Sequence, residues 1–202
     1  MRWLLLLAVI GACGASNPPV GLRGDWPHEV RDYDEVVRDL TRTTVMHKEY
    51  QEVLDVSATL KTPEWYAARA VLDAENRKLV EPQRSQRLIQ AQADAAGPYE
   101  IELMVTTWDR RENDLNRGKK SVWRVVLVDD TGAEIEPIEI VKDKRPAFTI
   151  RAEFPAYGDF ATAYIARFPR TKALLGPSVR QLRLRMSSPR GGVEIAWAAA
   201  GP

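Results

Sequence analysis

The chain has 202 residues, of which 45% are hydrophobic and 28% are charged, so it fits one globular domain or at most two small ones. The apolar fraction excludes a disordered chain, and the lack of any apolar run near the roughly 20 residues of a membrane-spanning helix excludes a polytopic protein. The net charge of +1 gives no electrostatic reason to expect a nucleic-acid partner, and the single cysteine excludes an intramolecular disulfide framework.

The first 13 residues have the order of a secretory signal. Arg2 supplies a positive charge, residues 3–10 form an apolar run, and the small residues Gly11 and Ala12 stand immediately before Cys13. In a helix, this apolar run covers about 12 Å, far less than the roughly 30 Å hydrocarbon core of a bilayer. The segment is therefore expected to be a cleaved leader rather than a transmembrane anchor.

Residues 10–13, Ile-Gly-Ala-Cys, resemble the lipobox of bacterial lipoprotein precursors, with Ile in place of the commoner Leu and Gly at the second position. The resemblance implies that residues 1–12 are removed and that the thiol of Cys13 carries a diacylglycerol, which anchors the protein in the cell envelope. The next residue is Gly14 rather than Asp, which favours the outer membrane under enterobacterial sorting. The alternative is a soluble secreted or periplasmic protein that is cleaved after Ala15.

The remaining chain divides into a tether and one domain. Residues 13–32 are rich in Pro and Gly and have little periodicity, which predicts an extended tether. The domain is expected at residues 33–202. Its first segment, residues 33–50, fits either a helix or a strand, whereas the alternation over residues 53–60 predicts a half-buried strand.

Two helices are predicted between residues 62 and 96. Thr62-Pro63-Glu64 offers an N-cap, a first-turn proline and an acidic side chain for a helix that runs to about residue 79. Pro82 opens a second helix, which stops at Gly97-Pro98. Both are short and mostly polar, so we expect them to pack across one edge or end of a sheet.

From residue 99 onward, apolar and polar side chains alternate as in strands. A register that pairs Leu182 with Trp197 and Arg185 with Glu194 joins the last two strands, with residues 187–192 as their loop. The other predicted strands lie at residues 99–105, 123–128, 133–141, 148–154 and 160–168. This pattern predicts a mainly β fold, an antiparallel β-sandwich of immunoglobulin-like outline with the two helices as an insert.

The sequence offers little sign of catalysis. His28 and His47 are the only near-neutral proton carriers, and neither belongs to a recognisable motif. Motifs for a serine nucleophile, a zinc protease, a phosphate loop or a dinucleotide site are missing. We therefore expect no catalytic residues, no cofactor and no metal site. A hydrolase that uses surface carboxylates from different strands is the alternative, because such a pair carries no sequence signature.

The polar loop at residues 108–118 is the first candidate for a partner contact, because long loops on a rigid sheet commonly carry recognition residues. Its candidate contact residues are Trp108, Arg110 and Arg111. Its oxygen-bearing side chains suit Ca²⁺, but their spacing is not that of an EF-hand and the two arginines would repel a cation, so we interpret them as turn formers. These side chains are Asp109, Asn113, Asp114 and Asn116.

Arg183 and Arg185 form a basic stripe on the outward face of the penultimate predicted strand. They could contact a phosphate or an acidic glycan, but cross-strand pairing with Glu194, or with acids such as Glu100 and Glu102, is the simpler interpretation.

The tryptophans raise the question of a sugar-stacking platform. Trp123 and Trp197 fall on apolar positions of predicted strands, so we assign them to the core. Trp108 opens the polar loop and is the one to test for exposure.

These features favour a membrane-anchored envelope lipoprotein whose domain binds an envelope protein or polysaccharide without catalysis. A purely structural lipoprotein within a larger assembly is a further hypothesis, which a large exposed apolar patch would support.

Overall fold

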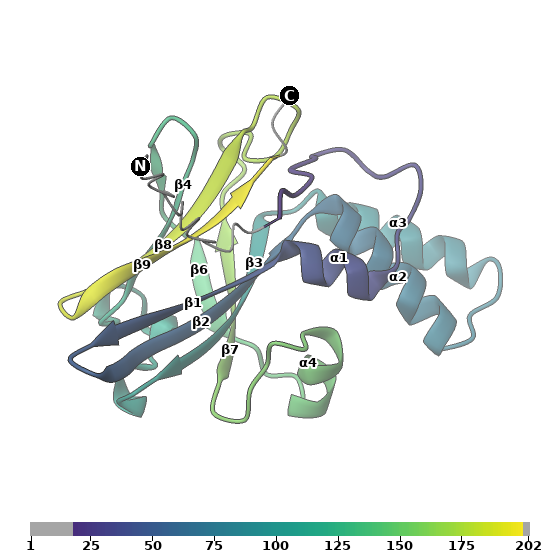
Figure 1. Ribbon diagram of the computed structural model, residues 1–202. Coiled ribbons are helices and arrows are strands. Elements are labelled where there is room, and N and C mark those ends of the chain that lie inside the picture. Colours follow the sequence, from purple (N-terminus) through teal and green to yellow (C-terminus); the bar gives the residue numbers. More distant parts are fainter. Residues whose placement is uncertain (1–17, 200–202) are drawn as a thin grey trace, which may run out of the picture.

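The computed structural model describes residues 18–199 and is mainly β, with two antiparallel sheets (Figure 1). The predicted leader at residues 1–12 and the predicted lipidation at Cys13 lie outside the described residues. The five-stranded sheet has the order β1 (Thr41–Lys48), β2 (Gln51–Lys61), β3 (Tyr99–Thr107), β7 (Thr162–Phe168) and β6 (Glu139–Lys142). The four-stranded sheet has the order β5 (Glu134–Ile135), β4 (Arg124–Val128), β8 (Gln181–Ser188) and β9 (Gly191–Ala198).

Four α-helices and two short 3₁₀ helices accompany the sheets. The first three α-helices gather at one end of the five-stranded sheet, and α4 stands apart from them (Figure 1). In the described part of the chain, no helix has the length and apolar character needed to cross a bilayer. The helices are α1 (Tyr33–Leu40), α2 (Pro63–Asn76), α3 (Gln83–Ala95), η1 (Arg110–Glu112), η2 (Leu115–Lys120) and α4 (Ala147–Glu153).

Residues 33–50 contain both structures that the pattern allows, first α1 and then β1. The Asp32 side chain caps α1 by accepting hydrogen bonds from the backbone N–H groups of Asp34 and Glu35. The buried side chains of α1 are Tyr33, Val36, Val37 and Leu40. That spacing gives a helix one apolar face, and the threonine-rich sequence that follows favours a strand.

The two predicted helices are confirmed as α2 and α3. The hydroxyl of Thr62 accepts a hydrogen bond from the backbone N–H of Trp65, and Pro63 occupies the first turn, as the capping pattern indicates. The strand predicted at residues 53–60 is part of β2. Ser57 and Thr59 on its polar side are buried too, and Asp55 on that side is half-buried. β2 lies between β1 and β3 in the sheet.

The segment predicted as a tether packs against the domain from residue 18 onward. Val20 and Leu22 are buried, and the N–H of Val20 donates to the carbonyl of Ala198 at 2.9 Å. The Arg42 guanidinium donates to the carbonyl of Pro18 at 2.6 Å. These contacts place the start of the described chain beside β1 and β9, where the two sheets meet.

Apolar side chains from both sheets form one hydrophobic core, which includes Trp123 and Trp197 as predicted. The Trp197 indole N–H donates to the carbonyl of Leu40 at 2.8 Å and so joins β9 to the end of α1. Residues 125–128 are buried on both faces of β4, which lies between β5 and β8. This arrangement is consistent with a β-sandwich.

The β8–β9 hairpin confirms the predicted register, in which Leu182 faces Trp197 and Arg185 faces Glu194. The predicted loop at residues 187–192 is wrong, because pairing continues to Ser188 opposite Gly191. Gly191 has a φ of 139°, a backbone conformation that glycine adopts easily because it lacks a Cβ atom. The chain can therefore turn within residues 189–190.

Two strand predictions are wrong. The segment 148–154 lies largely in α4, in which Ile150 is buried and Phe148 is exposed, and the buried Phe154 follows the end of the helix. The segment 133–141 is split at Pro137 into β5 and β6, which belong to different sheets. Proline has no N–H to donate to a ladder, so the chain leaves one sheet there and joins the other.

Candidate functional site

A pocket of about 720 Å³ lies where β2 begins and β3 ends, away from the end of the sheet that leads into α2. We call this pocket the Trp108 groove. It includes two of the predicted contact residues, Trp108 and Arg110. Its lining residues are Glu52, Thr106, Thr107, Trp108, Arg110, Asn113, Lys142, Asp159, Phe160 and Thr162.

Two exposed aromatic rings are the main feature of the Trp108 groove. Trp108 is 66% exposed and Phe160 is 74% exposed, although both are large apolar side chains. A strand is predicted from residue 160, but β7 begins at Thr162 and leaves Phe160 outside it. Neighbouring exposed aromatic side chains typically mark an interaction site.

Hydrogen bonds from the adjacent loop fix the base of the groove. The N–H of Trp108 donates to the carbonyl of Val53 at 3.2 Å. The Asn113 amide donates to the carbonyl of Val105 at 2.8 Å, and its oxygen accepts from the Tyr164 hydroxyl at 2.8 Å. These bonds hold the groove on the rigid sheet.

The other polar side chains of the loop mostly serve its own turns. Asp114 accepts hydrogen bonds from the Ser121 hydroxyl at 2.8 Å and from the N–H of Val122 at 3.2 Å. The Asp109 carboxylate caps η1 by accepting from the N–H of Arg111. The interpretation of Asp109 and Asp114 as turn formers is therefore confirmed, whereas the Asn113 side chain bonds to β3 and β7.

Of the four charged side chains that line the Trp108 groove, only Asp159 has an ion-pair partner among the described residues. Arg151 holds Asp159 in an ion pair with an N–O distance of 2.7 Å. Among the described residues, no ion pair engages Arg110, Lys142 or Glu52. The Arg110 guanidinium lies 6.0 Å from the centre of the Phe160 ring. The groove thus presents two unpaired cations and one unpaired anion beside its aromatic rings.

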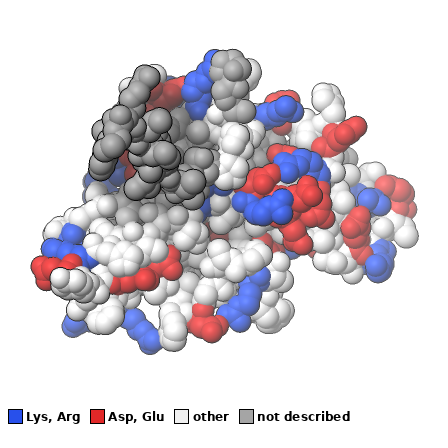
Figure 2. All heavy atoms as spheres, viewed as in Figure 1, with Lys and Arg blue, Asp and Glu red and all other residues white. Residues whose placement is uncertain are grey.

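The remaining predicted contact residues lie outside the groove and have acidic partners. Arg111 pairs with Asp109 at 2.8 Å. Arg183 and Arg185 pair with Glu194 at 3.1 and 3.2 Å, which confirms the cross-strand interpretation. Figure 2 shows acidic and basic side chains interspersed on the visible face. Exposed pairs of this kind contribute about 0 to 1 kcal/mol each to stability.

The predicted pairing of Arg183 or Arg185 with Glu100 and Glu102 is wrong. Both glutamates lie on β3 in the other sheet, so they do not face β8. Glu100 instead accepts hydrogen bonds from Arg167 at 2.6 Å and from Lys61 at 3.2 Å.

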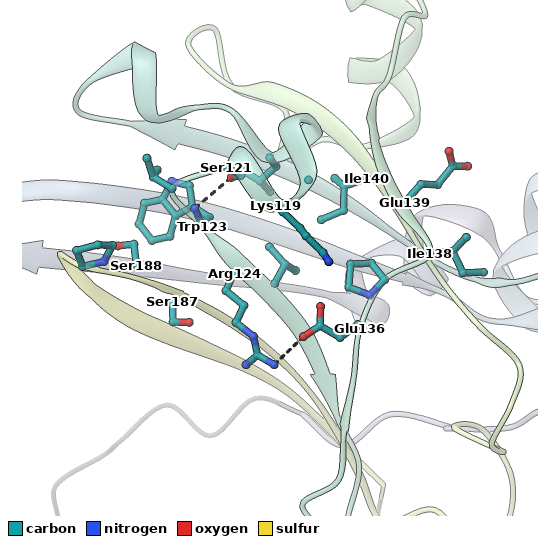
Figure 3. Close-up of a pocket in the computed structure, with 16 residues that line it drawn as sticks. Lys119, Ser121, Trp123, Arg124, Glu136, Ile138, Glu139, Ile140, Ser187 and Ser188 are labelled. Atoms are coloured by element: carbon teal, nitrogen blue, oxygen red, sulfur yellow. Dashed lines mark hydrogen bonds and ion pairs between the residues drawn. The ribbon is translucent and has the colours of Figure 1, made fainter.

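A second pocket, of about 700 Å³, lies between β4 and the segment that joins β5 to β6 (Figure 3). β4 pairs with β5 only at Leu127 and Val128, so residues 124–126 have no strand on this side. Lys119 projects from η2 into the gap (Figure 3), and Pro137 also lines this pocket. A lysine and a proline over a free edge are typical protection against unwanted strand pairing, and we interpret this pocket in that way.

A buried cluster of charged groups lies on the second face of the five-stranded sheet. Glu102 is fully buried there, and Lys61 Nζ lies 2.8 Å from its Oε2 atom. Burial raises the pKa of Glu102 to about 7, while the positive charge of Lys61 opposes the rise. Arg145 bridges Asp143 at 2.6 Å and Glu153 at 2.5 Å. This cluster lines neither pocket, so we assign it a structural role.

Glu52, Lys142 and Phe160 are among the groove residues that the sequence did not predict. They come from the start of β2, the end of β6 and the turn before β7, so no single stretch of sequence brings them together. A local signal was present for Phe160 alone, because the preceding Gly158-Asp159 is a turn sequence.

The described residues contain no group of three or more His, Cys, Asp or Glu side chains arranged to hold a metal ion. Both histidines are exposed and lie outside the Trp108 groove. No family model, curated protein or solved structure matches this chain. The functional conclusion therefore depends on the leader sequence and on the geometry of the groove.

Proposed function

We propose that the chain is a lipid-anchored protein of the bacterial cell envelope, with the outer membrane favoured, whose domain binds another envelope component without catalysis. The leader resembles that of a lipoprotein precursor, and the sole cysteine of the chain, Cys13, stands where lipidation requires it. The scaffold in this proposal is a β-sandwich of immunoglobulin-like outline, with α2 and α3 as an insert between β2 and β3.

The observation that carries the binding role is the Trp108 groove. It presents two exposed aromatic rings and three charged groups that have no ion-pair partner in the described part of the chain, and Asn113 bonds it to β3. A hydrolase would need a carboxyl group of raised pKa within reach of substrate. Glu102, whose pKa is raised to about 7, is buried outside the groove, and Asp159 within it is paired with Arg151. The geometry therefore favours binding over hydrolysis.

The anchor is tested with Cys13→Ser. We expect the wild-type protein to partition into the detergent phase, with an intact mass that shows loss of residues 1–12 and addition of acyl chains. The Cys13→Ser protein should lack the lipid and should not enter the detergent phase as the mature form does. An unmodified cysteine in the native product would contradict the proposal.

The groove is tested by retention of the purified, detergent-solubilised protein on envelope material from its own host. Trp108→Ala and Phe160→Ala should each reduce retention, because both rings are exposed and neither supports the core. Phe148→Ala is the matched control, since Phe148 is 77% exposed but belongs to α4 outside the groove. Equal retention of all four proteins, or equal loss in the control, would contradict a binding role for the groove.

A further inference from the structure

We propose that the Trp108 groove binds an acidic carbohydrate, with Trp108 and Phe160 stacking on sugar rings and Arg110 and Lys142 pairing with the sugar carboxylates. This inference rests on the proposed function, in which the groove is the binding site, and it adds the chemical class of the ligand.

The aromatic rings favour a sugar over a protein surface. A sugar ring has an apolar C–H face and a rim of hydroxyl groups, so it needs a flat apolar ring with polar side chains beside it. The groove supplies Trp108 and Phe160 together with the hydroxyls of Thr106 and Thr162. Protein–protein interfaces, by contrast, are depleted of Lys and Glu, whereas Lys142 and Glu52 both line the groove with these two rings.

The charges favour an acidic sugar over a neutral one. Within residues 18–199, Arg110 and Lys142 of the groove have no ion-pair partner and neither has Glu52, so one positive charge is in excess. Arg111 and Arg185, outside the groove, are engaged by carboxylates of the chain itself. A guanidinium group binds a carboxylate through two parallel hydrogen bonds. A ligand with a carboxylate would therefore supply the acceptor for the Arg110 guanidinium.

The position of the groove favours a polymer in the aqueous space over the bilayer. The described chain starts at Pro18, which contacts Arg42, and Arg42 is paired with Ala58 on β2. Glu52 in the groove is six residues from Ala58 along β2, a separation of about 20 Å. Cys13 is five residues from Pro18, which limits the anchor to a reach of about 18 Å. The described start of the chain, from which a lipid at Cys13 would extend, is therefore separated from the groove by much of the length of β2.

The test measures affinity by calorimetry on the mature lipidated protein in a sugar-free detergent at low salt. The probes are hexagalacturonate as the acidic sugar and cellohexaose as a neutral sugar of the same length. We expect hexagalacturonate to bind at least about tenfold more tightly, since loss of one charged hydrogen bond commonly costs a factor of about ten. Failure of hexagalacturonate to bind, or equal affinity for both sugars, would overturn the inference.

Variants assign the binding to the groove. Arg110→Gln and Lys142→Gln should each weaken hexagalacturonate binding about tenfold and reduce its salt dependence. Lys144→Gln is the matched control, because Lys144 is exposed and close in sequence but does not line the groove. Trp108→Ala should abolish binding. Hexagalacturonate binding that survives Trp108→Ala would be non-specific ionic attraction and would overturn the inference.

Two further measurements separate other partners from a glycan. In proteoliposomes with brominated anionic lipids, we expect no fluorescence quenching that depends on Trp108, and such quenching would mean that the groove faces the bilayer. The second measurement treats the host envelope material with protease. If groove-dependent retention is lost after protease, the ligand is a protein. The binding function then stands and the carbohydrate inference fails.

Discussion

Replacement of Glu102 by Gln is expected to remove a pH dependence of stability that the buried cluster imposes. Glu102 is fully buried, with Lys61 as its ion-pair partner and Asp143 and Arg145 nearby. Its pKa is raised from the ordinary value of 4.5 to about 7, because burial penalises the charged form. Gln has nearly the same shape and cannot ionise, and Lys61 keeps Glu100 as a second partner.

The sign and size of the effect follow from the proton balance. Between pH 4.5 and about 7, the folded protein holds a proton on Glu102 that the unfolded chain has lost. The free energy of unfolding of the wild type therefore falls as pH rises through this window. A rise in pKa from 4.5 to about 7 corresponds to about 3 kcal/mol. Above pH 7, Glu102→Gln should be more stable relative to the wild type than at pH 4.5, by about this amount.

The assay is urea unfolding followed by tryptophan fluorescence at several pH values from 4.5 to 8. Glu100→Gln is the matched control, since Glu100 lies two residues away on the same strand. There Lys61 and Arg167 overcome the effect of burial and hold the pKa below its usual range. Glu100→Gln should lower stability without flattening the pH dependence. Parallel profiles for the wild type and Glu102→Gln would refute the reasoning.

Three other predictions concern packing, surface charge and the free strand edge. Trp197→Ala should lower the free energy of unfolding by about 3 to 5 kcal/mol, measured by urea unfolding, because the ring is fully buried and its N–H is bonded. Arg185→Ala should cost less than about 1 kcal/mol in the same assay, because its pair with Glu194 is exposed, and a larger loss would contradict that assignment. Lys119→Val should increase self-association, seen as a sedimentation coefficient that rises with concentration, because it uncovers the free edge of β4. The neighbouring Lys120→Val, outside that pocket, should have no such effect.

Elements with a local signal could be predicted from the sequence. Thr62 and Pro63 cap α2 by contacts within one helical turn, so the helix start needs no information from distant residues. The β8–β9 register follows from two adjacent strands whose apolar faces must coincide. Both features depend on neighbours close in the chain.

Elements without a unique local solution could not be predicted. Ile150 and Phe154 are four residues apart, a spacing that suits one face of a helix and also one face of a strand. The exposure of Phe148 resolves the choice, and it depends on what the rest of the fold places around that segment. Pro137 marks a break in the sequence, but only the tertiary structure decides that β5 and β6 join different sheets.

Some residues of the Trp108 groove could likewise be predicted from the sequence, and others could not. Trp108 and Arg110 were found because they lie in one polar loop, whereas Phe160 and Lys142 reach the groove from distant segments. Whether a charged side chain is paired also depends on distant strands, so the sequence did not separate Arg110 from Arg185.

Glu100 and Glu102 show most directly what each level decides. The sequence by itself places both on the same face of one strand, separated by a single residue. The fold gives Glu100 two cationic partners and buries Glu102 against one, so the pKa falls for the first and rises for the second. Strand periodicity is a property of neighbours in the chain, whereas desolvation and ion pairing are properties of the residues that folding brings into contact.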